Sequence, residues 1–271
     1  MKILKFKKES KDKYKLFLDN NESITLYEDV IIKNNLLLSK EIENDKLDYL
    51  INQNNDIYAY NVALNYITFK MRSVKDVNNH LLKKGFDNII IKKVLERLIK
   101  EGYLNDLNFT KSFIKDRMNL TSTGPLKIRK ELLENGVKED IVNNEIQKID
   151  INIVEEKLRK LLEKQIKIKK GSLNSVKLKL VNYFINLGYE KDMITKILSN
   201  YEIKSDKTKL NKDYERLYNK YKSKYNGSEL LYFISQKLYS KGYTSDDIKE
   251  AISENKKNSS LWSSQEKVDT L

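Results

Sequence analysis

The chain has 271 residues and carries 52 Lys and Arg against 39 Asp and Glu, which gives a formal net charge of +13. It contains no Cys, one His and one Pro, which excludes disulfides, thiolate nucleophiles and any site that needs two histidines. No apolar run approaches the roughly 18 residues of a membrane span, and the first residues do not resemble a signal peptide. We therefore expect a cytoplasmic protein that has no contact with a membrane.

The N-terminal segment is predicted to form β-structure. Leu4 and Phe6 alternate with lysines, and apolar residues alternate with polar ones at 14–18 and 24–26, with a turn signal at 19–21. We predict a small antiparallel meander followed by a helix near residues 40–51. Together they form a first domain over residues 1–57.

Four glycines mark an internal repeat, since Gly85, Gly136, Gly188 and Gly242 lie 51, 52 and 54 residues apart. Apolar or aromatic residues occupy the same five positions around each glycine, namely eight and four residues before it and one, six and ten residues after it. This spacing predicts a helix that ends at the glycine and a second helix that follows a tight turn. The glycine is expected to adopt the left-handed conformation there.

A further helix precedes each of these pairs, near residues 58–70, 106–120, 153–168 and 209–225. The sequence therefore predicts a mainly α fold of tandem three-helix, helix-turn-helix-like repeats in an elongated arrangement, behind the N-terminal meander. The expected repeats span residues 58–104, 105–150, 151–204 and 205–255. A polar tail that contains Trp262 is expected over 256–271.

Basic residues in the repeats are the best candidates for function. Residues 1–60 carry 10 basic and 11 acidic groups, whereas residues 151–200 carry 11 and 5. A surface of that sign attracts polyanions such as nucleic acid, and the alternative is an ordinary solvated lysine surface. The candidates for contact with DNA or a DNA-bound filament are Lys70, Arg72, Lys75, Lys127, Arg129, Lys130, Lys167, Lys169, Lys170, Lys177 and Lys179.

Other side chains point to structure more than to chemistry. Tyr214, Tyr218, Tyr221 and Tyr225 follow helical spacing, which suits either base stacking or, preferably, a core face. His80 is expected on an exposed helix face. No phosphate-binding loop, dinucleotide-binding motif or nucleophile elbow occurs. We predict no enzymatic activity, and no catalytic, metal-binding or cofactor-binding residue.

Three motifs in order resemble the RecX family of recombinase regulators. The first is Ala63-Leu-Asn-Tyr-Ile-Thr-Phe-Lys-Met-Arg-Ser73, which continues to Gly85-Phe86; the second begins at Tyr103-Leu104; the third runs from Gly124-Pro125 to Gly136-Val137. The match is strongest over residues 58–137. The N-terminal strands and the fourth repeat resemble the longer form found in low-GC Gram-positive bacteria. Lys70 stands where the family usually has Arg, and Asn135 where it usually has Lys.

The resemblance implies a non-enzymatic inhibitor of the recombinase RecA. Such a protein binds along the groove of the RecA filament on single-stranded DNA and restrains ATP hydrolysis, strand exchange and filament growth. RecA and DNA are thus the expected partners, and DNA repair, recombination and the SOS response are the expected processes. The chain is expected to act as a monomer.

Two other functions fit parts of the pattern. One is a helix-turn-helix transcription regulator, although the third helices begin with acidic or neutral residues at 87–89, 138–140, 190–192 and 244–246, which disfavours contact with duplex phosphates. The other is a scaffold that binds proteins alone, with the positive charge incidental.

Overall fold

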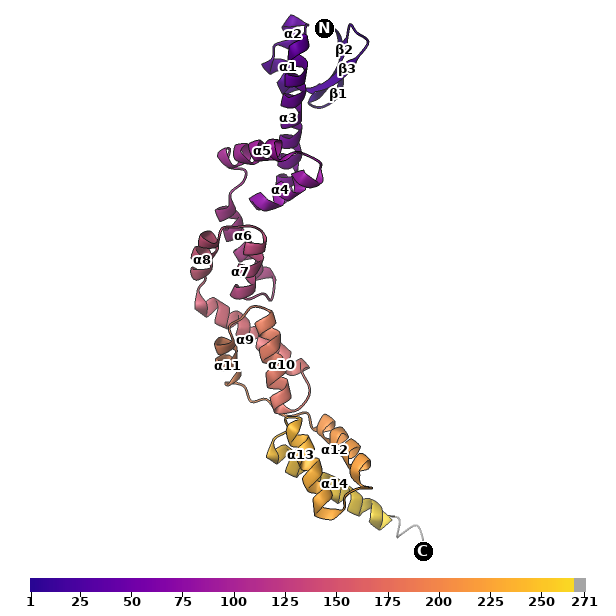
Figure 1. Ribbon diagram of the computed structural model, residues 1–271. Coiled ribbons are helices and arrows are strands. Elements are labelled where there is room, and N and C mark those ends of the chain that lie inside the picture. Colours follow the sequence, from indigo (N-terminus) through magenta and orange to yellow (C-terminus); the bar gives the residue numbers. More distant parts are fainter. Residues whose placement is uncertain (266–271) are drawn as a thin grey trace. The chain divides into compact units, whose positions relative to one another are not determined.

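The computed structural model describes residues 1–265, and the side chains of residue 44 and of residues 256–265 lie outside that description. The chain divides into two compact units. The first joins residues 1–115 with residues 131–145, and the second joins residues 116–130 with the chain from residue 146 onward. Figure 1 shows the order of the elements along the chain.

Three antiparallel strands open the first unit, β1 (Ile3–Ser10), β2 (Lys13–Leu18) and β3 (Ser23–Tyr27), in the order β1-β2-β3 (Figure 1). Leu16 on the central strand pairs with Phe6 on one side and with Ile24 on the other. Asn21 in the predicted turn has a φ of 64°, which Asn tolerates better than most residues. The predicted meander is confirmed.

Short helices that were not predicted follow the sheet: α1 (Glu28–Lys33), α2 (Leu36–Ser39) and the 3-10 turn η1 (Asn44–Lys46). Helices α1 and α2 pack on its apolar face. Leu16, Leu18 and Leu26 of the sheet share one buried cluster with Val30 of α1 and Leu50 further along the chain. This cluster gives the N-terminal segment a core of its own.

The two helices predicted near 40–51 and 58–70 are wrong as separate elements, because a single helix, α3 (Leu47–Thr68), replaces them. The polar stretch between them does not break the helix, since Asn54 bonds to the sheet. Its Oδ1 accepts a hydrogen bond from Tyr27 N at 2.8 Å, and its Nδ2 donates to Thr25 O at 3.2 Å. The boundary expected between residues 57 and 58 therefore lies inside a continuous helix.

The repeats contain the helices predicted from the glycine spacing. They are α4 (Val74–Lys83), α5 (Asn88–Lys100), α6 (Asp106–Leu120), α7 (Pro125–Glu134), α8 (Glu139–Gln147), α9 (Ile151–Ile168), α10 (Leu173–Asn186), α11 (Lys191–Leu198), α12 (Lys207–Tyr221), α13 (Gly227–Ser240) and α14 (Ser245–Gln265). Helix α14 continues past the expected start of the tail at residue 256. The side chain of Trp262 lies outside the described ones.

The five repeated apolar positions form the cores of the repeats. The residues eight and four before each glycine are 0% exposed in all four copies: Val77, Leu81, Ile128, Leu132, Leu180, Phe184, Ile234 and Leu238. None of the other twelve is exposed. In the first repeat, α3 contributes Ala59 and Ala63, both fully buried. The periodicity in the sequence is thus the burial pattern of the fold.

Each repeated glycine ends its helix in the same hydrogen-bonded turn. Gly85 has a φ of 87°, its N–H donates to Leu82 O, and the N–H of Phe86 donates to Leu81 O. The other three turns repeat both bonds, with φ values from 79° to 89°. This is a Schellman turn, which satisfies the last carbonyls of a helix and needs a left-handed residue.

The same turns join successive repeats, because the start of a middle helix packs on the turn of the following repeat. An ideal Cβ on Gly136 would lie 2.6 Å from Lys75 Cδ. One on Gly188 would lie 2.3 Å from the backbone N of Lys127, and one on Gly242 would lie 3.0 Å from Asn174 Cβ. At Gly85, which no repeat precedes, nothing lies within 4 Å.

Hydrogen bonds accompany this contact within each unit. In the second unit, Gly124 N donates to Leu187 O at 2.7 Å and Leu126 N donates to Gly188 O at 3.0 Å. Further along the same unit, Asn174 N donates to Gly242 O at 3.3 Å. In the first unit, Lys75 Nζ donates to Glu134 O at 2.9 Å. Unpaired donors at one helix start thereby meet unpaired carbonyls at another helix end.

This geometry predicts that the glycines differ in their tolerance of alanine. Gly188→Ala should lower the free energy of unfolding by about 3 kcal/mol or more, because left-handed strain of about 1–2 kcal/mol adds to the cost of the clash with Lys127. Gly85→Ala should cost only the strain, about 1–2 kcal/mol. Urea denaturation followed by circular dichroism measures both. Equal losses in the two variants would contradict the proposed close contact.

Candidate nucleic-acid and partner interface

The loop between α3 and α4 presents apolar and basic side chains together. Phe69 is 89% exposed and Met71 is 46% exposed, beside the exposed Lys70. The loop ends at the buried Ser73, whose Oγ accepts a hydrogen bond from Asp76 N at 3.1 Å, as the predicted N-cap requires. The cap fixes the loop against α4, so its exposed residues are held on an ordered backbone.

Arg72 in this loop is held by aromatic stacking. Its guanidinium carbon lies 4.2 Å from the centroid of the Tyr66 ring, and the Tyr66 ring stacks on His80 with centroids 3.9 Å apart. Its Nε is buried without a hydrogen-bond partner among the described residues. His80 is therefore half-buried in a stack and is not the simple surface residue that we expected.

Lys75 and Lys127 have structural contacts in addition to their charge. The stem of Lys75 packs on Gly136, and its Nζ donates to Glu134 O. Lys127 meets Gly188 through its backbone N, Cα and Cβ, and it is half-buried. Both residues therefore belong to the contacts between repeats, which the sequence pattern did not indicate. On α7, the other two predicted basic residues differ in exposure, since Arg129 is half-buried and Lys130 is exposed.

Five of the predicted basic residues lie where α9 ends and α10 begins. Lys167, Lys170 and Lys179 are exposed, while Lys169 and Lys177 are half-buried. Among the described residues, none of these five lysines forms an ion pair. Lys169 Nζ lies 5.1 Å from the centroid of the Tyr183 ring. The predicted lysines thus lie at the end of α9, in the loop that follows it and on α10, and Lys169 lies beside an aromatic ring.

The tyrosine stripe of α12 is mainly structural, as preferred from the sequence. Tyr214 is buried in the core of the fourth repeat, and burial raises the pKa of its hydroxyl. Tyr221 and Tyr225 are half-buried against that core, and both rings contact Phe233. Tyr218 alone in the stripe is exposed.

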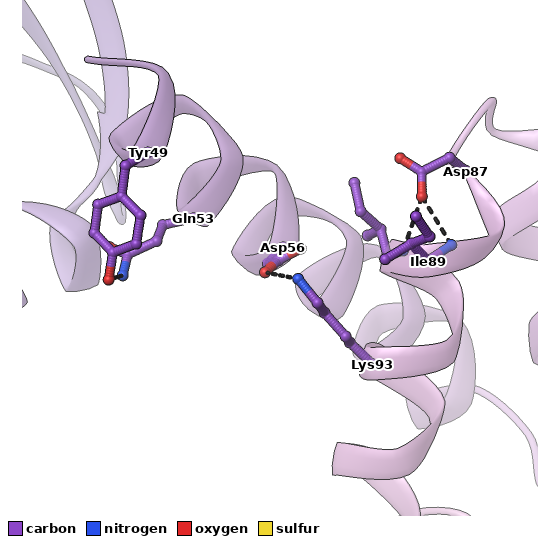
Figure 2. Close-up of polar contacts among 7 residues, drawn as sticks. Tyr49, Gln53, Asp56, Asp87, Ile89 and Lys93 are labelled. Atoms are coloured by element: carbon purple, nitrogen blue, oxygen red, sulfur yellow. Dashed lines mark hydrogen bonds and ion pairs between the residues drawn. The ribbon is translucent and has the colours of Figure 1, made fainter. Parts of the chain in front are cut away.

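A polar groove of about 430 Å³ lies between α1, α3 and α5, and the sequence did not predict it. Lys93 Nζ lies 3.4 Å from Asp56 Oδ2, and both residues line the groove. Figure 2 shows this ion pair. The guanidinium of Arg97 lies 3.9 Å from the Tyr60 ring centroid, and its Nε bonds to Glu101 at 2.8 Å.

Most charges of this groove are paired inside the protein. The hydrogen bonds from Tyr60 and Arg97 lower the pKa of the Glu101 carboxyl, and burial together with Glu101 raises the pKa of Tyr60 to about 12. The groove therefore ties α3 to α5 and offers less free positive charge than the lysines near α10.

No helix among the described residues has both the length and the apolar character that a membrane span requires.

The stack around His80 predicts a pH effect. Burial, followed by Lys84, Arg72 and Lys83, lowers the pKa of the imidazole below 6.5. Since the unfolded side chain titrates near 6.5, the unfolded state takes up the proton first, and stability should fall as the pH drops below that value. His80 is the only histidine, so an NMR titration of its ring protons reports the pKa directly. Lys84→Gln should raise it, whereas a wild-type value at or above 6.5 would contradict the stack.

Two family models match segments of the chain between residues 59 and 144. The model described as "RecX, first three-helix domain" matches residues 59–98, and "RecX, second three-helix domain" matches residues 105–144. A crystal structure of regulatory protein RecX has the same fold, with a TM-score of 0.63 at 20% identity over 73% of this chain and 98% of that one. The crystal structure of RecX from Lactobacillus salivarius matches with a TM-score of 0.50 at 26% identity. The match covers 54% of this chain and 96% of that one.

Full-length relatives extend the match to nearly the whole chain. Regulatory protein RecX of Streptococcus uberis is 33% identical over 260 residues, which cover 94% of this chain and 99% of that protein. Regulatory protein RecX of Halalkalibacterium halodurans is 29% identical over 93% of this chain and 98% of its own length. The resemblance predicted from the three motifs is thereby confirmed, and the chain belongs to the RecX family of regulatory proteins.

Proposed function

We propose that the chain is a non-enzymatic regulator that binds the RecA filament on single-stranded DNA and inhibits its ATP hydrolysis, strand exchange and growth. Membership of the RecX family implies an interaction with RecA. The observation that carries the DNA part of the proposal is the group of five lysines around the start of α10, which form no ion pair with any described residue. DNA repair and recombination are the processes that such an inhibitor would regulate.

Most of the residues proposed to contact DNA fall into two groups, those whose charge has no carboxylate partner among the described residues and those that also contact a neighbouring repeat. Lys70, Arg72 and the five lysines near α10 are free to meet phosphates, because their charges have no carboxylate partner among the described residues. The stem of Lys75 also packs between repeats, so a substitution there would mix binding with stability, whereas Lys127 meets Gly188 through its backbone and Cβ. Arg129 and Lys130 remain candidates on α7.

Phe69 is a proposed contact that charge alone does not reveal. An aromatic ring that is 89% exposed beside Lys70 suits stacking against an unpaired base, with the lysine placed for the adjoining phosphate. The signal in the sequence was the aromatic between Thr68 and Lys70, inside the first family motif.

The transcription-regulator alternative is less well supported. In α5, which would be the recognition helix of the first repeat, the carboxylate of Asp87 caps the helix start by accepting hydrogen bonds from Ile89 N and Ile90 N at 2.8 and 2.9 Å, and Figure 2 shows this cap. A carboxylate at that place repels the phosphates that flank a major groove. Protection of one defined duplex sequence in a footprint would favour this alternative.

Several weak contacts can together give tight binding to a filament. A filament repeats the same subunit, and repeats linked in one chain bind it with a raised effective concentration after the first contact. Inhibition would follow because a protein held across neighbouring subunits opposes their movement during ATP hydrolysis.

The central test measures RecA ATP hydrolysis on single-stranded DNA with added protein. We expect inhibition at stoichiometric amounts of wild-type protein and weaker inhibition by the triple variant Lys167→Gln, Lys169→Gln and Lys170→Gln. If these side chains neutralise three phosphates, the slope of log affinity against log salt for single-stranded DNA should become shallower by about 2.

The matched control is the triple variant Lys46→Gln, Lys160→Gln and Lys204→Gln, because these three exposed lysines already form ion pairs with acidic residues. The same change in net charge should leave the slope nearly unchanged. Absence of inhibition by the wild-type protein would refute the proposed function. Equal effects of the two triple variants would refute only the assignment of the α9–α10 lysines.

Phe69→Ala should weaken binding to single-stranded DNA by about 1–3 kcal/mol, which is roughly 5- to 150-fold, if the ring stacks on a base. Phe69→Trp should keep the affinity, because tryptophan also stacks. Leu38→Ala, at a side chain that is 85% exposed on α2, is the control for loss of an exposed apolar group. Fluorescence anisotropy of a labelled oligonucleotide measures the affinity of all three variants. If Phe69→Ala binds with wild-type affinity, the proposed stacking contact is wrong.

A further inference from the structure

A groove of about 770 Å³ lies in the first unit where the first repeat meets the second. It is lined by α4, α5, the start of α6, and the turn and first residues of α8. Its wall is mostly aliphatic, and two of the wall residues remain accessible, since Ile99 is 48% exposed and Leu107 is 38% exposed. Leu104, which also lines the groove, is buried. Such a wall suits one or two apolar side chains of another protein.

Two lysines and one aspartate line this groove, and they differ in whether another group of the protein already binds them. Lys75 and Lys138 line it, and Lys138 is exposed with no ion pair among the described residues. Lys75 donates one hydrogen bond to Glu134 O and keeps its positive charge. The single carboxylate, Asp106, already caps α4 by accepting from Val74 N at 3.0 Å. The groove therefore presents the two lysines to a ligand, while the carboxylate of Asp106 is already hydrogen-bonded within the protein.

The second unit has a corresponding groove of about 280 Å³ at the next junction. Met193 and Ile141 each lie five residues after their turn glycine, and Ile146 and Leu95 each lie ten residues after theirs. The apolar wall thus recurs at equivalent positions. The two lysines do not, because Leu126 stands in place of Lys75 and Glu190 in place of Lys138.

We propose that the groove in the first unit binds a segment of the RecA subunit that carries an apolar side chain next to an acidic one. This inference rests on the proposed function and assigns the protein partner to a groove that contains none of the lysines near α10, although Lys75 belongs both to this groove and to the proposed DNA contacts. The aliphatic wall takes the apolar side chain, and Lys75 and Lys138 pair with the acid. The corresponding groove in the second unit would accept an apolar side chain without that preference for acid.

The test compares binding of full-length variants to RecA filaments on immobilised single-stranded DNA and to the same DNA without RecA. Leu107→Glu should weaken filament binding about tenfold, because a charge on the wall removes the apolar contact and repels the acid. Its affinity for bare DNA should change by less than about twofold. Glutamate is acceptable in the first turn of α6, where negative charge is favoured.

Leu120→Glu is the matched control, since this residue lies on the same helix, is 80% exposed and does not line the groove. It should change neither affinity. Lys138→Glu, on the exposed rim, is a second variant that leaves the core intact, and it should also weaken filament binding selectively.

The possible results separate the two proposals. Wild-type filament binding by Leu107→Glu and Lys138→Glu, or an equal loss on bare DNA, would overturn the groove assignment and leave the proposed function standing. Failure of the wild-type protein to bind filaments better than bare DNA would overturn both.

Discussion

The fold depends on one contact, in which the start of a middle helix packs on the glycine turn of the following repeat. That turn needs a glycine for two separate reasons. Its backbone is left-handed, and at Gly136, Gly188 and Gly242 a neighbouring repeat occupies the space that a Cβ would take. Each repeat alone has a small core, so the hydrogen bonds and packing at these junctions stabilise repeats that would be marginal by themselves. Gly85 meets only the first requirement, since no repeat precedes it.

The junctions also determine where functional surfaces can form. The loop before a middle helix is fixed by its contact with the next turn, and the basic residues of the first and third repeats lie in or beside such loops. The grooves form at the same places, because a turn, a helix start and the linker between repeats meet there. One structural requirement thereby provides ordered cations at some positions and aliphatic walls at others, which is what binding to both DNA and a protein filament would require.

The local periodicity predicted much of this fold. The twenty apolar positions, the strands of the meander and the helix over residues 106–120 follow directly from spacing and from turn residues. Contacts between distant residues were not predictable in this way. The polar stretch around Asn54 looked like a helix break, but its side chain bonds to strand β3 and the helix continues. Lys75 and Lys127 looked like purely functional cations, and only the structure reveals that the stem of Lys75 packs on Gly136 and that the backbone and Cβ of Lys127 pack on Gly188. The stacking of His80 on Tyr66 likewise depends on the packing of α3 against α4.

Amide hydrogen exchange of the full chain tests the junction most directly. The N–H groups of Gly124, Leu126 and Asn174 lie at helix starts, where an isolated helix has no acceptor, and here each donates to a carbonyl of the next repeat. These amides should therefore exchange slowly, at rates close to those of the core amides of Ile128 and Val176. The first-turn amides of α13, which lack such a partner among the described residues, should exchange fast. Equally fast exchange at all of these helix starts would contradict the account.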